Sequence, residues 1–142
     1  MVKRMADVKP VEYVKIVAPT YPADVLNVIT RNVYLALKAL QHLEEAYVDD
    51  IVSLVKQWCG FKPRPGTIKN AFLQLEEVGV LVSEQKKIIA GKPAYTFKLT
   101  KYGEKLVSVL DEAIKLLTEA YYARYPRAKK TAPLKPCFPN KT

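Results

Sequence analysis

The chain has very few residues of the types that hold metal ions. His42 is its only histidine, and Cys59 and Cys137 are its only cysteines. A structural zinc site takes four cysteine and histidine ligands at short spacings, so a Cys/His metal cluster is excluded. The sequence also lacks a phosphate-cradling glycine loop and a nucleophile with a plausible base. We therefore expect no enzyme, no metal and no cofactor.

The two cysteines lie far apart in the sequence and allow two interpretations. In one, they are small apolar residues or incidental thiols. In the other, they form a disulfide of the kind that intracellular proteins of hyperthermophiles carry. The sequence alone does not decide between the two.

Long hydrophobic runs are absent as well. No apolar run approaches the ~18 residues of a membrane span. The basic N-terminal stretch MVKRMADVKP is not followed by a hydrophobic segment, so we expect no secretory signal, no membrane partner and a cytoplasmic location. A length of 142 residues, 49% of them hydrophobic, fits one globular domain with tails.

Acidic residues are scarce in two parts of this chain, whose net charge is +9. Residues 16–61 carry three cations against five acids, whereas residues 62–105 carry nine cations against four acids. The last segment, 124–142, has six cations and no acid. Positive charge concentrated in this way predicts a polyanionic partner, most simply nucleic acid.

Apolar residues spaced three and four positions apart predict three helices in the first half of the chain. The first follows Asp24 as its N-cap, the second follows Asp49 and ends at Gly60, and the third begins near Thr67 and ends at Gly79. Their apolar positions are Leu26, Ile29, Val33, Leu37, Leu40 and Leu43; Ile51, Val52, Leu54, Val55 and Trp58; and Ile68, Ala71, Phe72, Leu75 and Val78. The stretch FKPRPG makes a turn before the third helix.

The second half of the chain predicts a β-hairpin and a long helix. VLVSEQKKII and AYTFKLT read as two strands joined by the turn AGKP. A helix then runs from about Lys101 to Ala123. Its apolar stripe is Leu106, Leu110, Ala113, Ile114, Leu117 and Tyr121.

This order of elements predicts a mainly α fold with a small β-hairpin, that is, a winged helix-turn-helix followed by a long C-terminal helix. Residues 1–23 form an N-terminal extension with at most one short strand. Residues 24–123 form the winged-helix domain, including the last helix. Residues 124–142 are rich in proline and lysine, and we expect them to be disordered.

Two stretches carry a resemblance to a known family. Gly66–Leu81 reads GTIKNAFLQLEEVGVL, and Gly91–Leu106 reads GKPAYTFKLTKYGEKL. The first is similar to the third helix of the PadR-like winged-helix transcriptional regulators, and the second is similar to their Gly-Arg-Pro wing followed by Tyr-x-Leu-Thr-x-x-Gly. Lys69, Leu73 and Lys92 depart from the residues common there, which are tyrosine, a basic residue and arginine.

The resemblance implies how the chain would meet double-stranded DNA. In such folds the third helix enters the major groove, while the wing lies along the phosphate backbone. The residues on the open side of the third helix are then candidates for base contacts: Thr67, Lys69, Asn70 and Gln74. The cations beside this helix and on the wing are candidates for backbone contacts: Lys62, Arg64, Lys86, Lys87 and Lys92.

Other interpretations stay open. Polar residues on the outside of a helix are expected on any soluble protein, and lysines on a hairpin also protect a sheet edge. Leu73 fits base reading poorly. It keeps open a winged-helix interaction module that binds protein, or binds DNA or RNA without sequence specificity. The wide apolar surface of the last helix predicts a homodimer, with Val109, Leu116 and Leu117 at the interface.

Overall fold

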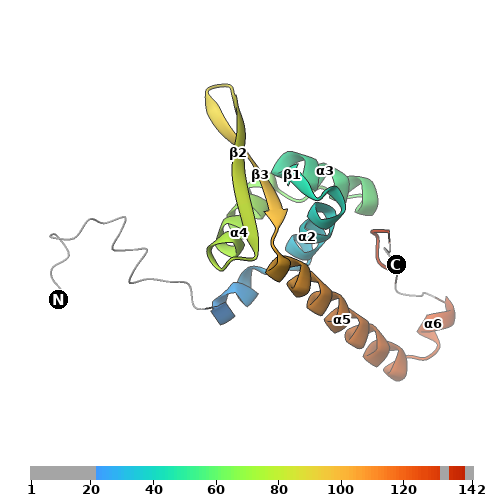
Figure 1. Ribbon diagram of the computed structural model, residues 1–142. Coiled ribbons are helices and arrows are strands. Elements are labelled where there is room, and N and C mark those ends of the chain that lie inside the picture. The colour runs from blue at the N-terminus through green and yellow to red at the C-terminus, as the bar shows by residue number, and fades with distance from the viewer. Residues whose placement is uncertain (1–21, 132–134, 140–142) are drawn as a thin grey trace, which may run out of the picture.

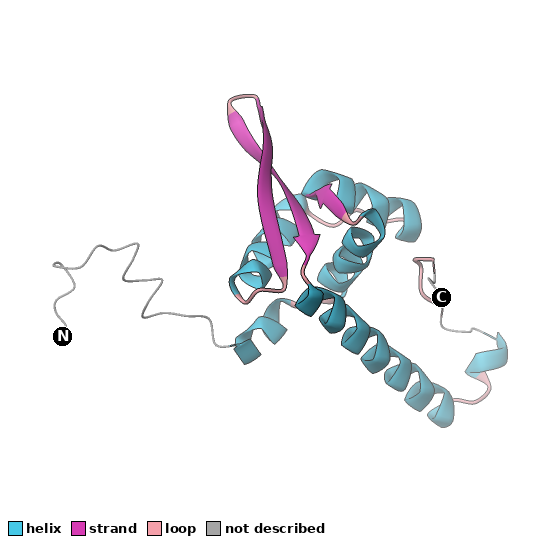
Figure 2. Ribbon diagram, viewed as in Figure 1, coloured by secondary structure: helices cyan, strands magenta, loops and turns pink. Residues whose placement is uncertain are grey.

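The computed structural model describes residues 22–131 and 135–139 and shows a mainly helical fold with one small antiparallel sheet (Figures 1 and 2). The elements in chain order are a 3-10 helix η2 (Pro22–Val28), α2 (Arg31–Leu43), β1 (Glu45–Tyr47), α3 (Val48–Cys59), α4 (Pro65–Glu77), β2 (Leu81–Ile89), β3 (Lys92–Leu99), α5 (Lys101–Arg124) and α6 (Ala128–Thr131). This order confirms the predicted winged helix with a long C-terminal helix. The expected strand of the N-terminal extension lies outside the described residues.

The first predicted helix is in fact two elements. The Thr30 side chain accepts a hydrogen bond from the backbone N–H of Val33 at 3.3 Å, so Thr30 is the N-cap of α2. The prediction of one helix starting after Asp24 is therefore wrong. η2 precedes the break, and Leu26 on it is 66% exposed. The apolar spacing continued across the break because a 3-10 helix and an α-helix have similar periods.

The sheet contains a strand that the sequence pattern did not indicate. Its order is β1-β3-β2, so β3 lies between the short β1 and the long β2. β1 pairs antiparallel with β3, and Ala46 lies opposite Phe97. The Thr96 hydroxyl donates to the Glu45 carboxylate at 2.6 Å and holds the two strands together on one face. β1 thus ties the base of the wing to the helical body.

The inner face of α4 forms the centre of the core. Ile68, Phe72 and Leu75 are completely buried, and Ala71 nearly so, as the helical spacing predicted. The Phe72 ring packs edge-on against Phe97 of β3, with 5.3 Å between the ring centroids. Because four consecutive inward positions are occupied by apolar side chains, the rotation of α4 about its axis is fixed.

The start of α5 is anchored at the end of β3. The Thr100 hydroxyl donates to the Gly79 carbonyl at 2.7 Å and accepts from the Gly103 N–H at 3.2 Å, which makes Thr100 the N-cap. A Cβ added at Gly103 would lie 2.2 Å from the carbonyl oxygen of Val80. The Thr-x-x-Gly spacing therefore has a structural cause, since only glycine lets the helix approach the backbone so closely.

Farther along, one polar cluster joins α5 to α2. Asp111 accepts a hydrogen bond from the Tyr34 hydroxyl. It also forms an ion pair with Lys38, whose Nζ lies 3.0 Å from the Asp111 carboxylate. Burial, and then the hydrogen bond to Asp111, raise the pKa of Tyr34 well above its ordinary value. Beyond this cluster α5 extends away from the body (Figure 1).

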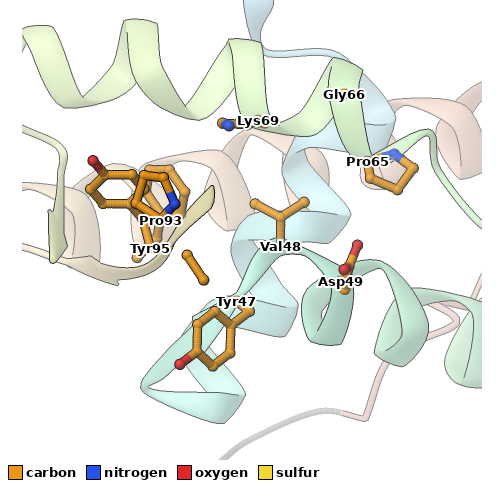
Figure 3. Close-up of a pocket in the computed structure, with 10 residues that line it drawn as sticks. Tyr47, Val48, Asp49, Pro65, Gly66, Lys69, Pro93 and Tyr95 are labelled. Carbon is orange, nitrogen blue, oxygen red and sulfur yellow. The ribbon is translucent and has the colours of Figure 1, made fainter. Parts of the chain in front are cut away.

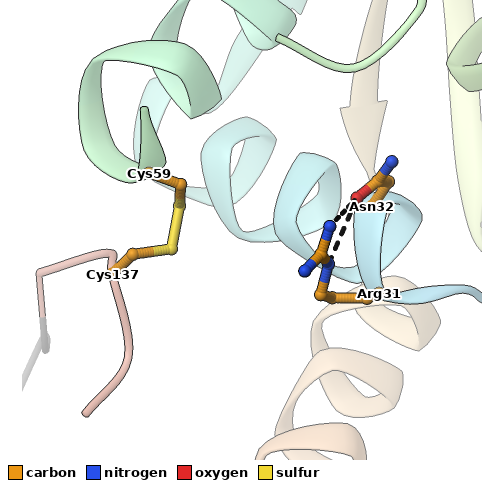
Figure 4. Close-up of a disulfide and its surroundings, with 4 residues drawn as sticks. All are labelled: Arg31, Asn32, Cys59 and Cys137. Carbon is orange, nitrogen blue, oxygen red and sulfur yellow. Dashed lines mark hydrogen bonds between the residues drawn. A yellow bond between two sulfur atoms is a disulfide. The ribbon is translucent and has the colours of Figure 1, made fainter. Parts of the chain in front are cut away.

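The C-terminal segment returns to the body and is covalently attached to it. Cys137 forms a disulfide with Cys59 at the end of α3 (Figure 4). The neighbouring Phe138 ring lies with its centroid 5.9 Å from that of Tyr34 and 6.3 Å from that of Trp58. Residues 128–131 of the predicted tail form α6, and Cys137 is attached to α3; that the tail is disordered stays a prediction. Composition alone did not reveal this disulfide.

Candidate nucleic-acid interface

The outward face of α4 presents the residues predicted to read bases. Thr67, Lys69, Asn70 and Gln74 are all exposed, because the apolar positions between them point into the core. Leu73 lies on the same face and is 42% exposed. Pro65 occupies the first turn of α4, where its missing N–H leaves no hydrogen bond unmade. That the four polar residues contact DNA stays a prediction.

The cations predicted to contact phosphate differ in whether an acidic side chain already pairs with them. Lys86 is already paired: its Nζ lies 2.6 Å from Glu84 and 3.2 Å from Glu45. These hydrogen bonds, the one to Glu84 first, raise the pKa of Lys86. The hydrogen bond from Thr96, and then that from Lys86, lower the pKa of Glu45. Lys86 would have to leave both carboxylates to reach a phosphate.

The other four predicted cations are more accessible to a phosphate than Lys86 is. Lys62, Arg64 and Lys92 are exposed, and within the described part of the chain none of them has a salt bridge. Lys87 extends over the Tyr47 ring, with its Nζ 5.3 Å from the ring centroid. Sequence reasoning missed the two acids that engage Lys86. Glu45 approaches the wing only because β1 pairs with β3, and β1 was not predicted.

A hollow of about 240 Å³ lies between the start of α4 and β3 of the wing (Figure 3). Lys69 borders it from α4, Pro93 and Tyr95 from β3, and Tyr47 and Asp49 from the segment where β1 runs into α3. The start of α4 and the outer half of β3 therefore share one continuous surface. Tyr47, Asp49 and Tyr95 were not predicted as site residues, and no local pattern in the sequence singles them out.

The exposed side of α5 carries the residues predicted for a dimer interface. Val109 is 63% exposed, Leu116 64% and Leu117 69%. Ile114 and Tyr121 are also exposed, so apolar side chains continue along the helix after it leaves the body. Their pairing with a second protomer stays a prediction.

Residues 22–131 and 135–139 contain neither a metal cluster nor a helix that could cross a membrane. No group of three or more His, Cys, Asp or Glu side chains within these residues is placed to hold a metal ion. Every helix described there is too short or too polar to span a lipid bilayer.

Comparison with protein-family models and with curated proteins found no match. Among solved structures, a PadR-like transcription factor from Bacteroides fragilis superposes with a TM-score of 0.56 and 27% identity, over 64% of this chain and 86% of that one. The chain has a PadR-like winged-helix fold. A PadR family regulator from Eggerthella lenta (TM-score 0.57, 22% identity, 81% of this chain and 96% of that one) shares this PadR-like fold. A transcriptional regulator from Clostridium thermocellum also shares the fold, with a TM-score of 0.58 and 19% identity over 70% of this chain and 96% of that one.

Proposed function

We propose that the protein is a transcriptional regulator that binds double-stranded DNA through α4 and the wing. The observation that carries this proposal is the exposed polar face of α4, which a shared hollow connects to a projecting hairpin that bears lysines. The PadR-like fold supports the proposal, because the solved structures that share it include proteins described as transcription regulators.

In this proposal α4 lies in the major groove and reads sequence. The groove admits one α-helix, and the side chains on its outward face then meet base edges. Asn70 and Gln74 have the amide groups that bond bidentately to adenine, and Lys69 donates to guanine. Each good contact of this kind contributes ~1–3 kcal/mol of discrimination between bases.

Phosphate contacts position the complex without reading sequence. Lys62, Arg64, Lys87 and Lys92 supply four contacts per protomer, since Lys86 is engaged by two carboxylates. Four neutralised phosphates predict that log K falls with log salt concentration with a slope of about −4 per protomer. A slope near −5 would indicate that Lys86 leaves its acids and joins the interface.

The proposed regulator acts as a homodimer. Val109, Leu116 and Leu117 on α5 lose their exposure to water if α5 packs against its counterpart in a second protomer. A two-fold dimer of this kind places two α4 helices on half-sites about one turn of DNA apart. A monomeric mass by light scattering at micromolar concentration would contradict this part of the proposal.

Selection from a random DNA library tests the proposal. The wild type should enrich a motif with two related halves, and the variant Lys69→Ala/Asn70→Ala/Gln74→Ala should lose that motif. A matched control is Ser53→Ala/Lys56→Ala/Gln57→Ala, which removes similar exposed side chains from α3. If both variants select the same motif as the wild type, the base readers are misassigned.

One observation favours a second candidate function. Leu73 places an apolar side chain in the middle of the outward face of α4, where a protein partner would bury it. The second candidate is an interaction module that binds protein, or nucleic acid without sequence preference. It predicts that the selection gives no motif, with retention of DNA that depends only on salt, and that Leu73→Ser weakens capture of the partner.

A further inference from the structure

The tip of the wing exposes two large apolar side chains that packing does not explain. Ile88 is 68% exposed and Ile89 is 53% exposed, at the outer end of β2. Adjacent residues of a strand point to opposite faces of the sheet, so no single surface of the domain could bury both. A preference for β-branched residues in strands does not require isoleucine at exposed positions, because threonine serves equally well.

The hairpin of β2 and β3 projects from the helical body (Figure 1), and Ile88 and Ile89 are the last two residues of β2. Every β2 residue from Gln85 to Ile89 is exposed, and Lys86 and Lys87 still contact the body through Glu45 and the Tyr47 ring, so the tip is the short part of the hairpin beyond Lys87. Ile88 lies opposite Pro93, and Ile89 lies opposite Lys92. Ala90 and Gly91 close the tip in two residues, both with positive φ (52° and 77°). The tip is therefore a narrow apolar end on a long arm.

The charge around the tip selects a negatively charged occupant. Lys87 and Lys92 flank the two isoleucines on opposite strands. The acid of β2, Glu84, lies below them and is bonded to Lys86 at 2.6 Å. An apolar end with a cationic collar complements DNA, whose minor groove exposes base and sugar edges between two rows of phosphates.

The position of the arm favours DNA over other anionic surfaces. The hollow beside Lys69 is lined by Pro93 and Tyr95 of the arm, so the arm leaves the domain next to the start of α4. If α4 occupies a major groove, the adjacent groove along the duplex is the minor one. The three residues from Lys87 to the turn at Ala90 extend about 10 Å, which is enough to reach the floor of a minor groove that is ~7.5 Å deep.

We propose that Ile88 and Ile89 enter the minor groove beside the α4 site, open it and bend the duplex away from them. A hairpin with two strands ~4.8 Å apart is wider, with its side chains, than a groove of ~6 Å, so it can enter only if the groove widens. Apolar wedges in the minor groove act in this way and unstack a base step. This inference rests on the proposed function and adds a contact that reads the deformability of the sequence rather than its bases.

The test measures bending and affinity on the duplex enriched by the selection described above. Energy transfer between dyes at the two ends reports bending, and 2-aminopurine at the step beside the α4 site reports unstacking. Ile88→Thr/Ile89→Thr keeps the β-branched shape and removes much of the apolar surface. It should abolish the bend and the 2-aminopurine signal and weaken binding by about tenfold, with an unchanged salt slope.

Two control variants separate the wedge from other effects. Val82→Thr changes a 48%-exposed apolar residue at the base of the same strand and should leave bending and affinity as in the wild type. Lys87→Ala should lower the salt slope by about one and retain the bend. Circular dichroism of each variant checks that the hairpin and helices are intact.

Five outcomes would overturn the inference. The first is equal bending and affinity for the isoleucine variant and the wild type. In the second, the isoleucine variant loses only salt dependence. In the third, it loses binding to phosphatidylserine vesicles and keeps wild-type behaviour on DNA, which would assign the tip to a lipid surface. In the fourth, the wild type binds no duplex at all, which rejects the proposed function too. In the fifth, the wild type binds the duplex without bending it, which rejects the wedge but not the proposed function.

Discussion

α2 and α5 have similar apolar spacing and opposite surroundings. α2 buries seven of its 13 residues, whereas α5 buries only Gly103 and Val107 of its 24. Other elements of the same chain cover the apolar face of α2. The apolar face of α5 loses its cover after Leu110, which is the last apolar residue of the helix that packs against the core, although leucines continue along it. A periodic stripe thus predicts that a helix forms, but it does not identify what packs against it.

The same substitution in both helices gives the largest expected contrast. Leu37 on α2 is completely buried, and Leu37→Ala should lower the free energy of unfolding by about 4 kcal/mol, through lost apolar burial and a cavity. Leu117 on α5 is 69% exposed, and Leu117→Ala should change the stability of the protomer by at most about 0.5 kcal/mol. Urea unfolding at a dilute concentration measures both. Equal losses would refute the contrast.

The disulfide attaches the C-terminal segment to α3, and so to the buried part of the domain. Cys59→Ser/Cys137→Ser should lower the free energy of unfolding by about 3 kcal/mol, because the unfolded chain is no longer constrained over a sequence separation of 78 residues. Reduction of the wild type should have the same effect and should leave the variant unchanged. A reductant that does not lower wild-type stability would show that the bond contributes nothing in solution.

The base of α5 should be far less tolerant than its surface. Gly103→Ala should cost about 2 kcal/mol, since its Cβ would meet the Val80 carbonyl at 2.2 Å and Leu99 at 2.9 Å. Gly66→Ala is the matched control: its Cβ would have no neighbour within 4 Å, and an alanine in α4 should be neutral or slightly stabilising. Thermal unfolding of the two variants would test the difference. Similar midpoints would mean that the start of α5 can shift to make room for the added methyl group.

The smallest effect on protomer stability is expected on the outer part of α5, where assembly should change instead. Leu116→Glu/Leu117→Glu should alter the free energy of unfolding of the protomer by less than about 0.5 kcal/mol and should convert the proposed dimer to a monomer. Sedimentation equilibrium measures the mass, with Ser108→Glu as a control that adds charge elsewhere on the helix. A dimer that persists in the double variant would place the interface elsewhere.

The local pattern was sufficient for α4 and insufficient for the start of α2. Four apolar side chains at helical steps fixed the buried face of α4, and hence the exposed positions of Asn70 and Gln74. Before α2, the same kind of stripe crossed a break that the Thr30 cap creates. The start of a helix is set by its capping residue as well as by apolar spacing, and here the Thr30 cap sets the start of α2.

Features that depend on distant pairing could not be predicted. β1 has three residues, too few for a periodic signal, and it exists because β3 pairs with it some fifty positions later. Lys86 was predicted to be available for phosphate, but Glu45 reaches it through that same pairing. Likewise, the spacing of Cys59 and Cys137 gives no sign that α5 and the returning segment bring them together.

The bond between Cys59 and Cys137 makes α4, the wing and α5 parts of one closed covalent loop. A protease that cuts at Ala90–Gly91, on the exposed wing tip, therefore opens the loop without releasing a fragment. The nicked protein would migrate as one species in a denaturing gel without reductant and as two species with it. Cleavage of the wing would therefore leave the two halves of the chain joined by the disulfide.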